Sequence, residues 1–367
     1  MRFAIIGAGV IGRTHAAAIN ELGPEAELTL VVDEMPARAM EVAEAHGAEY
    51  GTSSAQALDR DDIDAVAICT PSGQHAALAV AALEAGKHIV VEKPLDVTLE
   101  AALRVVDAER RSGRTATVIS QHRFDAASQL VQRAVQENRF GRLTSAVASL
   151  AWWRTQGYYD SGDWRGTWAL DGGGALMNQG IHTIDLLVWM LGDPVEVYAQ
   201  TACLAHERIE VEDTAAATIR FANGALAVVH GTTAAYPGMT ARLQIHGNRG
   251  SAVIDGDRLE YFHAASGDAD SGAYGAGASA NQAGDVLGEQ EGGATAGADP
   301  AALSGAHSDQ YRDFVAAVSQ GRAPLVTVAE AAKTLAVVGA IYESARTGRP
   351  TPVQFDALRE GIDHTPA

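Results

Sequence analysis

Two polar side chains are candidates for acid–base and electrostatic chemistry. Lys93 stands in the motif Glu92-Lys93-Pro94 directly after an apolar run. An amine at the end of a strand can stabilise a forming alkoxide or polarise a carbonyl. His182 stands in a helical pattern, and an imidazole suits proton transfer because its ordinary pKa lies near neutrality. A lysine on a loop is more commonly a solvated charge and a lone histidine more commonly structural, so position has to decide.

The neighbours of His182 suggest how it is oriented. A helical pattern begins near Gly174. Its polar residues recur on one face: Asn178, His182, Asp185 and Trp189. We interpret Asn178 as a ligand of the substrate or an orienting partner of the imidazole. Asp185 would serve the imidazole only if it turns toward the ring, and the alternative is a purely structural polar stripe.

A glycine-rich loop near the N-terminus indicates a dinucleotide site. The run Gly7-Ala8-Gly9-Val10-Ile11-Gly12 follows a strand pattern and opens a helical one, which is the context that makes G-x-G-x-x-G informative. Its first glycine permits a tight turn, its second lets the backbone approach a pyrophosphate, and its third lets helix and strand pack closely. The helix N-terminus then offers N–H groups to the phosphates. A glycine turn without a ligand is the alternative.

An acid after the second strand pattern predicts which dinucleotide binds. Asp33 stands about twenty residues beyond the glycine loop, where a carboxylate can bond the ribose hydroxyls. Because the same carboxylate would repel a 2′-phosphate, we expect NAD rather than NADP. Arg38 is close enough in the sequence to weaken that preference, so NADP stays open.

Further candidates for contact with the cofactor follow the third and fourth strand patterns. Ligands of a doubly wound sheet lie at the carboxyl ends of its strands. The candidates at these ends are Thr70, Pro71, His75, Glu92 and Lys93. We interpret Cys69, just before them, as a small buried hydrophobe.

Aromatic and arginine side chains gather between positions 152 and 165. The candidates for substrate binding here are Trp153, Arg154, Tyr159, Trp164 and Arg165. The CH faces of a sugar stack on aromatic rings, and arginine forms hydrogen bonds with hydroxyls or with a carboxylate. An acidic sugar or a sugar nucleotide is therefore among the possible substrates. The same rings are equally consistent with a core or a subunit interface. Because the remaining histidines, including His122, His206 and His230, show no metal-ligand spacing, we predict no catalytic metal.

The first half of the chain alternates between strand and helix patterns. Continuous apolar runs, typical of strands covered on both faces, occur at 3–6, 28–32, 65–69, 88–91 and 115–119. Alanine-rich helical patterns separate or follow these runs at 11–22, 35–46, 75–85 and 99–111. This rhythm predicts an α/β domain with a doubly wound parallel sheet.

The pattern changes after residue 121, where we place a domain boundary between 1–121 and 122–367. Consecutive strand patterns predict a largely antiparallel sheet; they occur at 141–151, 195–202, 215–221, 225–233, 241–246 and 252–255. Asn223-Gly224 predicts a hairpin with a type I′ turn. Helices are expected at 308–318 and 328–346. Residues 264–302 are rich in glycine and alanine and are expected to form a mobile surface excursion, with a lid as the alternative.

Composition excludes several classes of protein. The 367 residues include 27 Lys and Arg against 46 Asp and Glu, which gives a net charge of −19 and disfavours a nucleic-acid partner. No apolar run reaches the roughly 18 residues of a membrane helix, and the N-terminus is not typical of a signal peptide. The two cysteines, Cys69 and Cys203, form no disulfide framework. We therefore expect a cytoplasmic protein.

The glycine loop, Glu92-Lys93-Pro94 and the segment 172–185, in this order, resemble the Gfo/Idh/MocA oxidoreductase family. The resemblance extends over most of the chain and excludes only 264–302. It implies a Rossmann domain followed by an α+β domain with an open, mainly antiparallel sheet, through which subunits form dimers or tetramers. It also implies reversible oxidation of a secondary alcohol on a sugar or cyclitol.

The same resemblance assigns roles to particular residues. Lys93 matches the lysine of the family's EKP motif and His182 the histidine proposed as acid or base. Inositol dehydrogenases of the family carry Asp four residues before that histidine, where this chain has Asn178, so either His182 or Lys93 could carry the proton. Two other functions stay open: an enzyme that keeps NAD bound through a transient oxidation, giving epimerisation, elimination or glycoside cleavage, and a sensor of nucleotide or sugar without catalysis.

Overall fold

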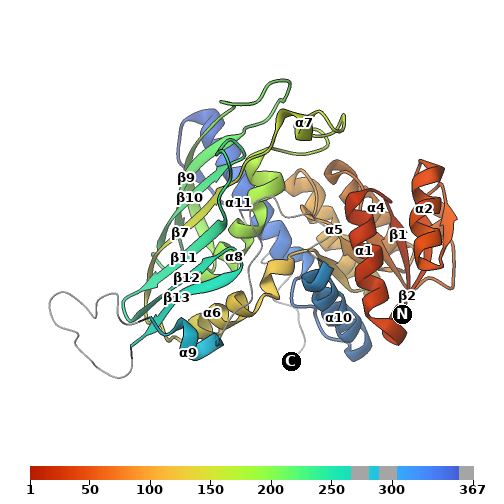
Figure 1. Cartoon of the computed structure of the whole chain (residues 1–367), viewed down its shortest axis with the longest axis horizontal. Coiled ribbons are helices and arrows are strands. Elements are labelled where there is room, and N and C mark those ends of the chain that lie inside the picture. Colours follow the sequence, from red (N-terminus) through yellow and green to blue (C-terminus); the bar gives the residue numbers. More distant parts are fainter. Residues whose placement is uncertain (266–280, 289–303, 355–367) are drawn as a thin grey trace.

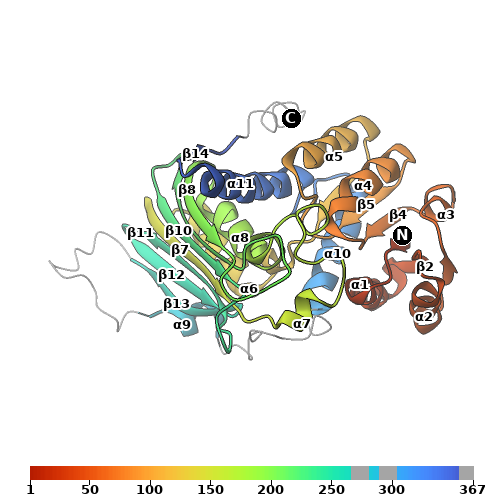
Figure 2. The same ribbon diagram turned by 90° about the horizontal axis from the view of Figure 1, so that it is seen from above.

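The computed structural model describes residues 1–265, 281–288 and 304–354. These residues form two sheets that lie side by side, the smaller one in the N-terminal part and the larger one in the C-terminal part (Figure 1). Seen from above, two long helices, α8 (Ile181–Leu191) and α11 (Val328–Thr347), lie between the large sheet and the N-terminal part (Figure 2). The two expected halves of the fold are confirmed.

The small sheet is parallel throughout and has the strand order β3-β2-β1-β4-β5-β6. Its strands are β1 (Arg2–Ile6), β2 (Glu27–Val32), β3 (Glu49–Gly51), β4 (Ala65–Ile68), β5 (His88–Val91) and β6 (Ala116–Val118). The order reverses between β1 and β4, and ligands bind at such a switch point. The short β3 escaped prediction because only its third residue is buried, which leaves no apolar run.

Helices cover both faces of this sheet, which explains why its strands read as continuous apolar runs. The helices are α1 (Val10–Glu21), α2 (Pro36–His46), α3 (Ala55–Leu58), α4 (His75–Glu84), α5 (Leu99–Ser112) and α10 (Ser304–Gln320). In β1, Phe3 and Ile5 share a core with α1, α2 and α10, whereas Ala4 and Ile6 belong to the core beneath α3, α4 and α5. The division at residue 121 stays a prediction. The late helix α10 packs on α1, so a segment of the second predicted domain lies against the first.

The large sheet has the order β13-β12-β11-β7-β10-β9-β8-β14, and only β7 and β10 pair in parallel. Its strands are β7 (Leu143–Ala151), β8 (Pro194–Ala202), β9 (Thr214–Phe221), β10 (Leu226–Thr232), β11 (Ala241–Gly247), β12 (Gly250–Asp255), β13 (Arg258–Ala264) and β14 (Thr351–Pro352). Buried and exposed residues alternate along β9, so one face carries the core and the other is open. The helices α8, α11 and α6 (Ala126–Gln136) lie on the covered face.

One local expectation needs correction, and another falls mostly outside the described residues. The hairpin between β9 and β10 forms, but Gly224 alone of its two predicted turn residues has a positive φ, +88°, so the turn is not type I′. Most of 264–302 lies outside the described residues. Within it, α9 (Ala283–Leu287) packs Ala283 into the core, and Asn281 accepts a hydrogen bond from β13, so this short piece is attached to the large sheet; the expected mobile excursion stays a prediction.

Candidate active site

A cavity of about 1670 Å³ opens at the carboxyl ends of the small sheet, and residues from the large-sheet part close its other side. Pockets for one drug-sized ligand measure roughly 300–1,000 Å³, so this cavity has room for a large cofactor together with a substrate. The glycine loop and Asp33 line one end, whereas Asn178 and His182 line the other.

The glycine loop has the backbone that a pyrophosphate requires. Gly7 has φ +102°, and a Cβ on it would lie 2.5 Å from the carbonyl oxygen of Cys69. A Cβ on Gly12 would lie 2.1 Å from the carbonyl oxygen of Gly7, so close packing of helix and strand does need this glycine. Nothing lies within 4 Å of a Cβ built on Gly9, and no side chain caps α1, so the first N–H groups of the helix face the cavity.

Asp33 is tied to the glycine loop. Its Oδ2 accepts a hydrogen bond of 2.8 Å from the backbone N–H of Ala8, and its Oδ1 accepts one of 2.8 Å from Met35. Both bonds leave further lone pairs for ribose hydroxyls, since a carboxylate has about four acceptor sites. Arg38 lines the same end of the cavity and is exposed.

The wall after β4 is held by a buried histidine. The two ring nitrogens of His75 contact the carbonyl oxygens of Pro94, at 2.7 Å, and Thr70, at 2.8 Å. This side chain therefore joins the Thr70-Pro71 loop to the loop after β5. Thr70, Pro71 and His75 line the cavity, whereas Pro94 does not. Cys69 is buried, as expected, and burial raises the pKa of its thiol well above the ordinary value.

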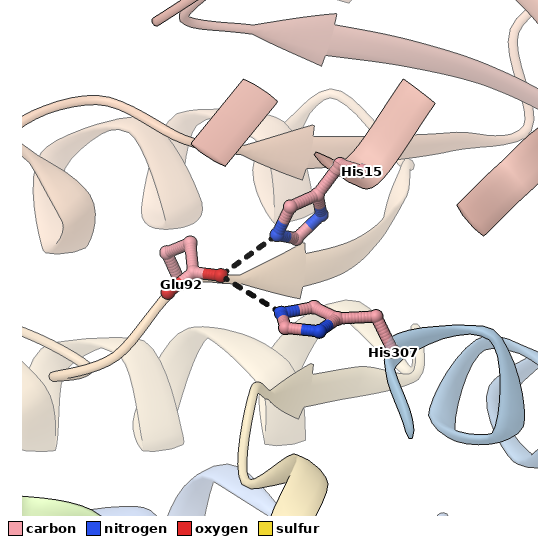
Figure 3. Close-up of side chains that lie close together, drawn as sticks. All are labelled: His15, Glu92 and His307. Carbon is pink, nitrogen blue, oxygen red and sulfur yellow. Dashed lines mark hydrogen bonds and ion pairs between the residues drawn. The ribbon is translucent and has the colours of Figure 1, made fainter. Parts of the chain in front are cut away.

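Glu92 is a buried carboxylate between two imidazoles (Figure 3). Its Oε1 lies 2.8 Å from Nε2 of His15, on α1, and 3.6 Å from Nε2 of His307, on α10. Burial opposes the charge, but these two contacts hold the pKa of Glu92 well below its usual range. Glu92 thus fixes the end of β5 between α1 and α10, directly before Lys93.

Lys93 reaches across the cavity to the large-sheet part. Its Nζ donates to the carbonyl oxygen of Asn178 at 2.8 Å and lies 3.4 Å from Oδ1 of that side chain. Nδ2 of Asn178 in turn donates to Oδ1 of Asp171 at 2.6 Å. Burial lowers the pKa of Lys93, while the Glu92 and Asp171 carboxylates oppose that shift. The peptide bond between Lys93 and Pro94 is cis.

The helix that carries His182 does not begin as expected. Ala175–Gly180 is a π-helix, and the α-helix α8 starts only at Ile181. The turn before it approaches another chain segment closely, since a Cβ on Gly174 would lie 1.7 Å from the carbonyl oxygen of Glu212. The carboxylate of Glu212 accepts hydrogen bonds from the N–H groups of Gly174 and Leu176 and so caps the segment.

The predicted polar stripe on this helix is therefore split. Asn178 and His182 line the cavity, but Asp185 is buried and makes two bonds to Arg123, of 2.7 Å from Nε and 2.8 Å from Nη2. The guanidinium also lies 5.2 Å from the ring centre of Trp189. Asp185 is a structural partner of Arg123 and does not supply the carboxylate that Asn178 lacks.

His182 lies beside a second histidine that the sequence did not single out. The ring centres of His182 and His122 are 5.3 Å apart, with the rings at 80°. Burial lowers the pKa of His182 well below its ordinary value, and the nearby charges of Lys93 and His122 lower it further. The imidazole is therefore neutral near pH 7, the form that accepts a proton.

Arginines and aromatic rings form one wall of the cavity. The guanidinium of Arg165 lies between the rings of Tyr158 and Trp164, 4.3 and 4.5 Å from their centres. Arg154 lies 4.9 Å from the ring centre of Trp152 and donates to Gln179. All of these residues line the cavity.

Two predicted substrate ligands lie outside this wall. Trp153 pairs with Ala234 and contacts the rings of His206 and Tyr236. Successive residues of an extended segment face opposite sides, so Trp152 lines the cavity and Trp153 does not. Tyr159 is buried, with its hydroxyl 2.8 Å from that of Thr233.

Comparison with known proteins agrees with this geometry. Residues 1–120 match the family described as "Oxidoreductase family, NAD-binding Rossmann fold", and residues 128–253 match "GFO/IDH/MocA C-terminal domain". The chain belongs to the Gfo/Idh/MocA family. It is an NAD-binding oxidoreductase.

Its relatives act on different substrates. Inositol 2-dehydrogenase of Rhizobium meliloti is 31% identical over 275 residues, which cover 73% of this chain and 79% of that protein. The WlbA dehydrogenase of Chromobacterium violaceum, crystallised with NADH and UDP-GlcNAcA, is 33% identical with a TM-score of 0.84, over 97% of this chain and 96% of that one. Levoglucosan dehydrogenase in complex with NADH is 26% identical with a TM-score of 0.83, over 96% and 99% of the two chains.

The chain's own residues fit the nicotinamide cofactor present in the two solved structures. The open space at Gly9, the uncapped start of α1 and the remaining acceptor sites of Asp33 suit the phosphates and a ribose of NAD. None of the described helices is long and apolar enough to cross a membrane. The absence of a catalytic metal and the formation of dimers or tetramers stay predictions.

Proposed function

We propose that this protein is an NAD-dependent dehydrogenase that oxidises a secondary alcohol of a sugar or cyclitol, or reduces the corresponding ketone. The observation that carries the proposal is the convergence of Lys93, Asn178 and His182 on the cavity that contains the glycine loop. Side chains from the end of β5 and from the helical segment beside the large sheet meet there, as a reaction between a cofactor and a second ligand requires.

The side chains divide the work between charge and proton transfer. The cation of Lys93 stabilises the alkoxide that forms on the substrate, and it is aimed by its bond to Asn178. Neutral His182 accepts the hydroxyl proton. Bound NAD would supply the hydride acceptor, held by the glycine loop and Asp33.

Charge on the cavity wall favours an acidic sugar among the possible substrates. Arg154 and Arg165 line the same cavity as Lys93, and their positive charges contribute to lowering the pKa of Lys93. Guanidinium groups stacked on aromatic rings stay in place and can bind a carboxylate through two parallel hydrogen bonds. A sugar with a carboxylate, free or as a sugar nucleotide, matches this wall better than a neutral polyol.

The test is a dehydrogenase screen with NAD and with NADP against matched pairs of substrates, such as a hexuronic acid with its hexose and inositols as neutral cyclitols. We expect NADH formation at 340 nm, with kcat/KM at least about tenfold higher for the acid of a pair. Arg154→Gln and Arg165→Gln should remove most of that preference. Turnover without net NADH would instead indicate a transient oxidation, and binding without any product would indicate a sensor.

A further inference from the structure

His122 is held between two carboxylates from distant parts of the chain. Its Nδ1 lies 2.8 Å from Oδ2 of Asp125, which precedes α6, and 3.2 Å from Oδ1 of Asp257, in the turn between β12 and β13. We call these three residues the His122 triad. Each member is partly buried, with side-chain exposures of 20%, 18% and 30%, so the charges are only partly screened by water.

The triad gives His122 a fixed positive charge. Burial alone would lower the pKa of the imidazole, but the hydrogen bonds to Asp125 and Asp257 outweigh burial and raise it to about 10. His122 is therefore an imidazolium at any pH where a dehydrogenase works. Both carboxylates lie at Nδ1 of His122, and the imidazolium is the member of the triad whose ring contacts His182.

This imidazolium touches His182. The two rings are nearly perpendicular, and a small cavity of about 40 Å³, lined by both histidines and by Asp257, lies against them. Among the described residues, neither ring nitrogen of His182 takes part in a hydrogen bond, so no carboxylate or carbonyl of its own helix orients the ring. The side chain that fixes one side of the His182 ring is His122.

We propose that the His122 triad is a positioning group for His182: it packs the ring in one orientation and keeps it in the neutral form that accepts the substrate's proton. The proposal rests on the proposed function of His182. It assigns to His122, Asp125 and Asp257 a role that the catalytic motifs do not contain. The physical cause is simple, because a fixed cation in ring contact disfavours a second cation on its neighbour.

Other charged groups face His182 and set the background against which the triad acts. Lys93, at the end of β5, and His307, on α10, act in the same direction as His122, whereas Glu92 acts in the opposite direction. Arg242, on β11, lines the small cavity beside His182, but it is paired with Asp255 at 2.6 Å. A change at the triad alters one contribution and leaves these four groups in place.

The direct test is a histidine titration that needs no substrate. In protein with ¹³C-labelled histidine and bound NAD, the His182 resonance is assigned by its loss in His182→Gln. In the wild type we expect His182 to be neutral throughout pH 6–8, so its resonance should not shift in that range. In His122→Asn we expect the pKa of His182 to be higher by roughly one unit. Asp257→Asn should move the His182 pKa down or leave it, since it removes negative charge while Asp125 still holds the imidazolium.

The different responses of the two variants, an upward shift of the His182 pKa in His122→Asn and none in Asp257→Asn, separate electrostatics from damage to the fold. An unchanged His182 titration in folded His122→Asn, or upward shifts in both variants, would overturn the proposal; circular dichroism verifies the fold of each variant. The acid limb of kcat/KM for alcohol oxidation should follow the titration of His182 in each variant. If the titration moves as expected and the acid limb does not, the triad positions His182 as described, and the proposed role of His182 as the base is wrong.

Discussion

Lys93 and Asn178 meet across the cavity, with Nζ of the lysine 2.8 Å from the backbone carbonyl oxygen of the asparagine. The bond joins the end of β5, in the small sheet, to the π-helix Ala175–Gly180, which precedes α8 beside the large sheet. A backbone carbonyl is a fixed acceptor, so it aims the amine without depending on the rotamer of Asn178. Because Asn178 also bonds Asp171, the amine has a carboxylate two hydrogen bonds away.

Replacing Lys93 by Met should lower kcat/KM by roughly 10²–10³-fold, because the variant loses the cation that stabilises the alkoxide. Met has a similar length and fills the same space, so NADH binding, followed by fluorescence, should stay within about twofold of the wild type. Lys93→Arg is the matched control that keeps the charge, and it should retain more activity than the Met variant. Normal turnover in Lys93→Met would remove this residue from the mechanism.

Replacing Asp171 by Asn should move the alkaline limb of kcat/KM to lower pH by roughly half to one unit. The Asp171 carboxylate supports the positive charge of Lys93, so its loss lowers the pKa of an amine that burial already depresses. Activity falls as the pH rises through the pKa of Lys93, since the neutral amine cannot stabilise an alkoxide. Asp193→Asn, whose carboxylate pairs with Lys333, serves as the control and should leave the limb in place.

The sequence predicted the small sheet well because its strands are buried on both faces. Continuous apolar runs such as Ala65–Ile68 can be recognised without knowing their partners. The π-helix could not be predicted in the same way. The π-helix depends on Glu212, far along the chain, whose carboxylate accepts hydrogen bonds from the N–H groups of Gly174 and Leu176. The periodicity of a helical segment does not reveal such a long-range contact.

The candidate site was predicted where a motif marks it and missed where distant residues assemble it. Lys93 and His182 belong to motifs and both line the cavity. His122 and Asp257 are separated by more than a hundred positions, so their contact is invisible in the sequence. The error at Trp153 has another cause, because a shift of one residue along an extended segment changes which side chain faces the cavity.

Replacing Asp33 by Asn should raise the preference for NADP over NAD by at least about tenfold, because a carboxylate next to a 2′-phosphate costs several kcal/mol. Asn keeps one oxygen, so it can retain the bond to Ala8 or the bond to Met35 but not both, and the KM for NAD should also rise. Glu34→Gln removes a neighbouring negative charge at the same end of the cavity. This variant tests whether the cofactor preference depends on Asp33 in particular or on negative charge in general. Equal ratios of kcat/KM in Asp33→Asn and the wild type would show that Asp33 does not select the cofactor.

Glu109 provides a test of the fold that is independent of catalysis. Burial raises the pKa of this carboxyl, on α5, to about 7, although the N–H of Ala116 bonds to it. In the unfolded chain the pKa returns to its ordinary value near 4.5, so the fold favours the protonated form. The stabilisation is fully present below about pH 4.5 and is lost as the pH rises through 7. Glu109→Gln should therefore raise the free energy of unfolding above pH 7, by up to about 3 kcal/mol, and change it little at pH 4.5. Urea unfolding at both pH values measures the difference, and an equal effect at the two pH values would mean that Glu109 does not titrate in this range.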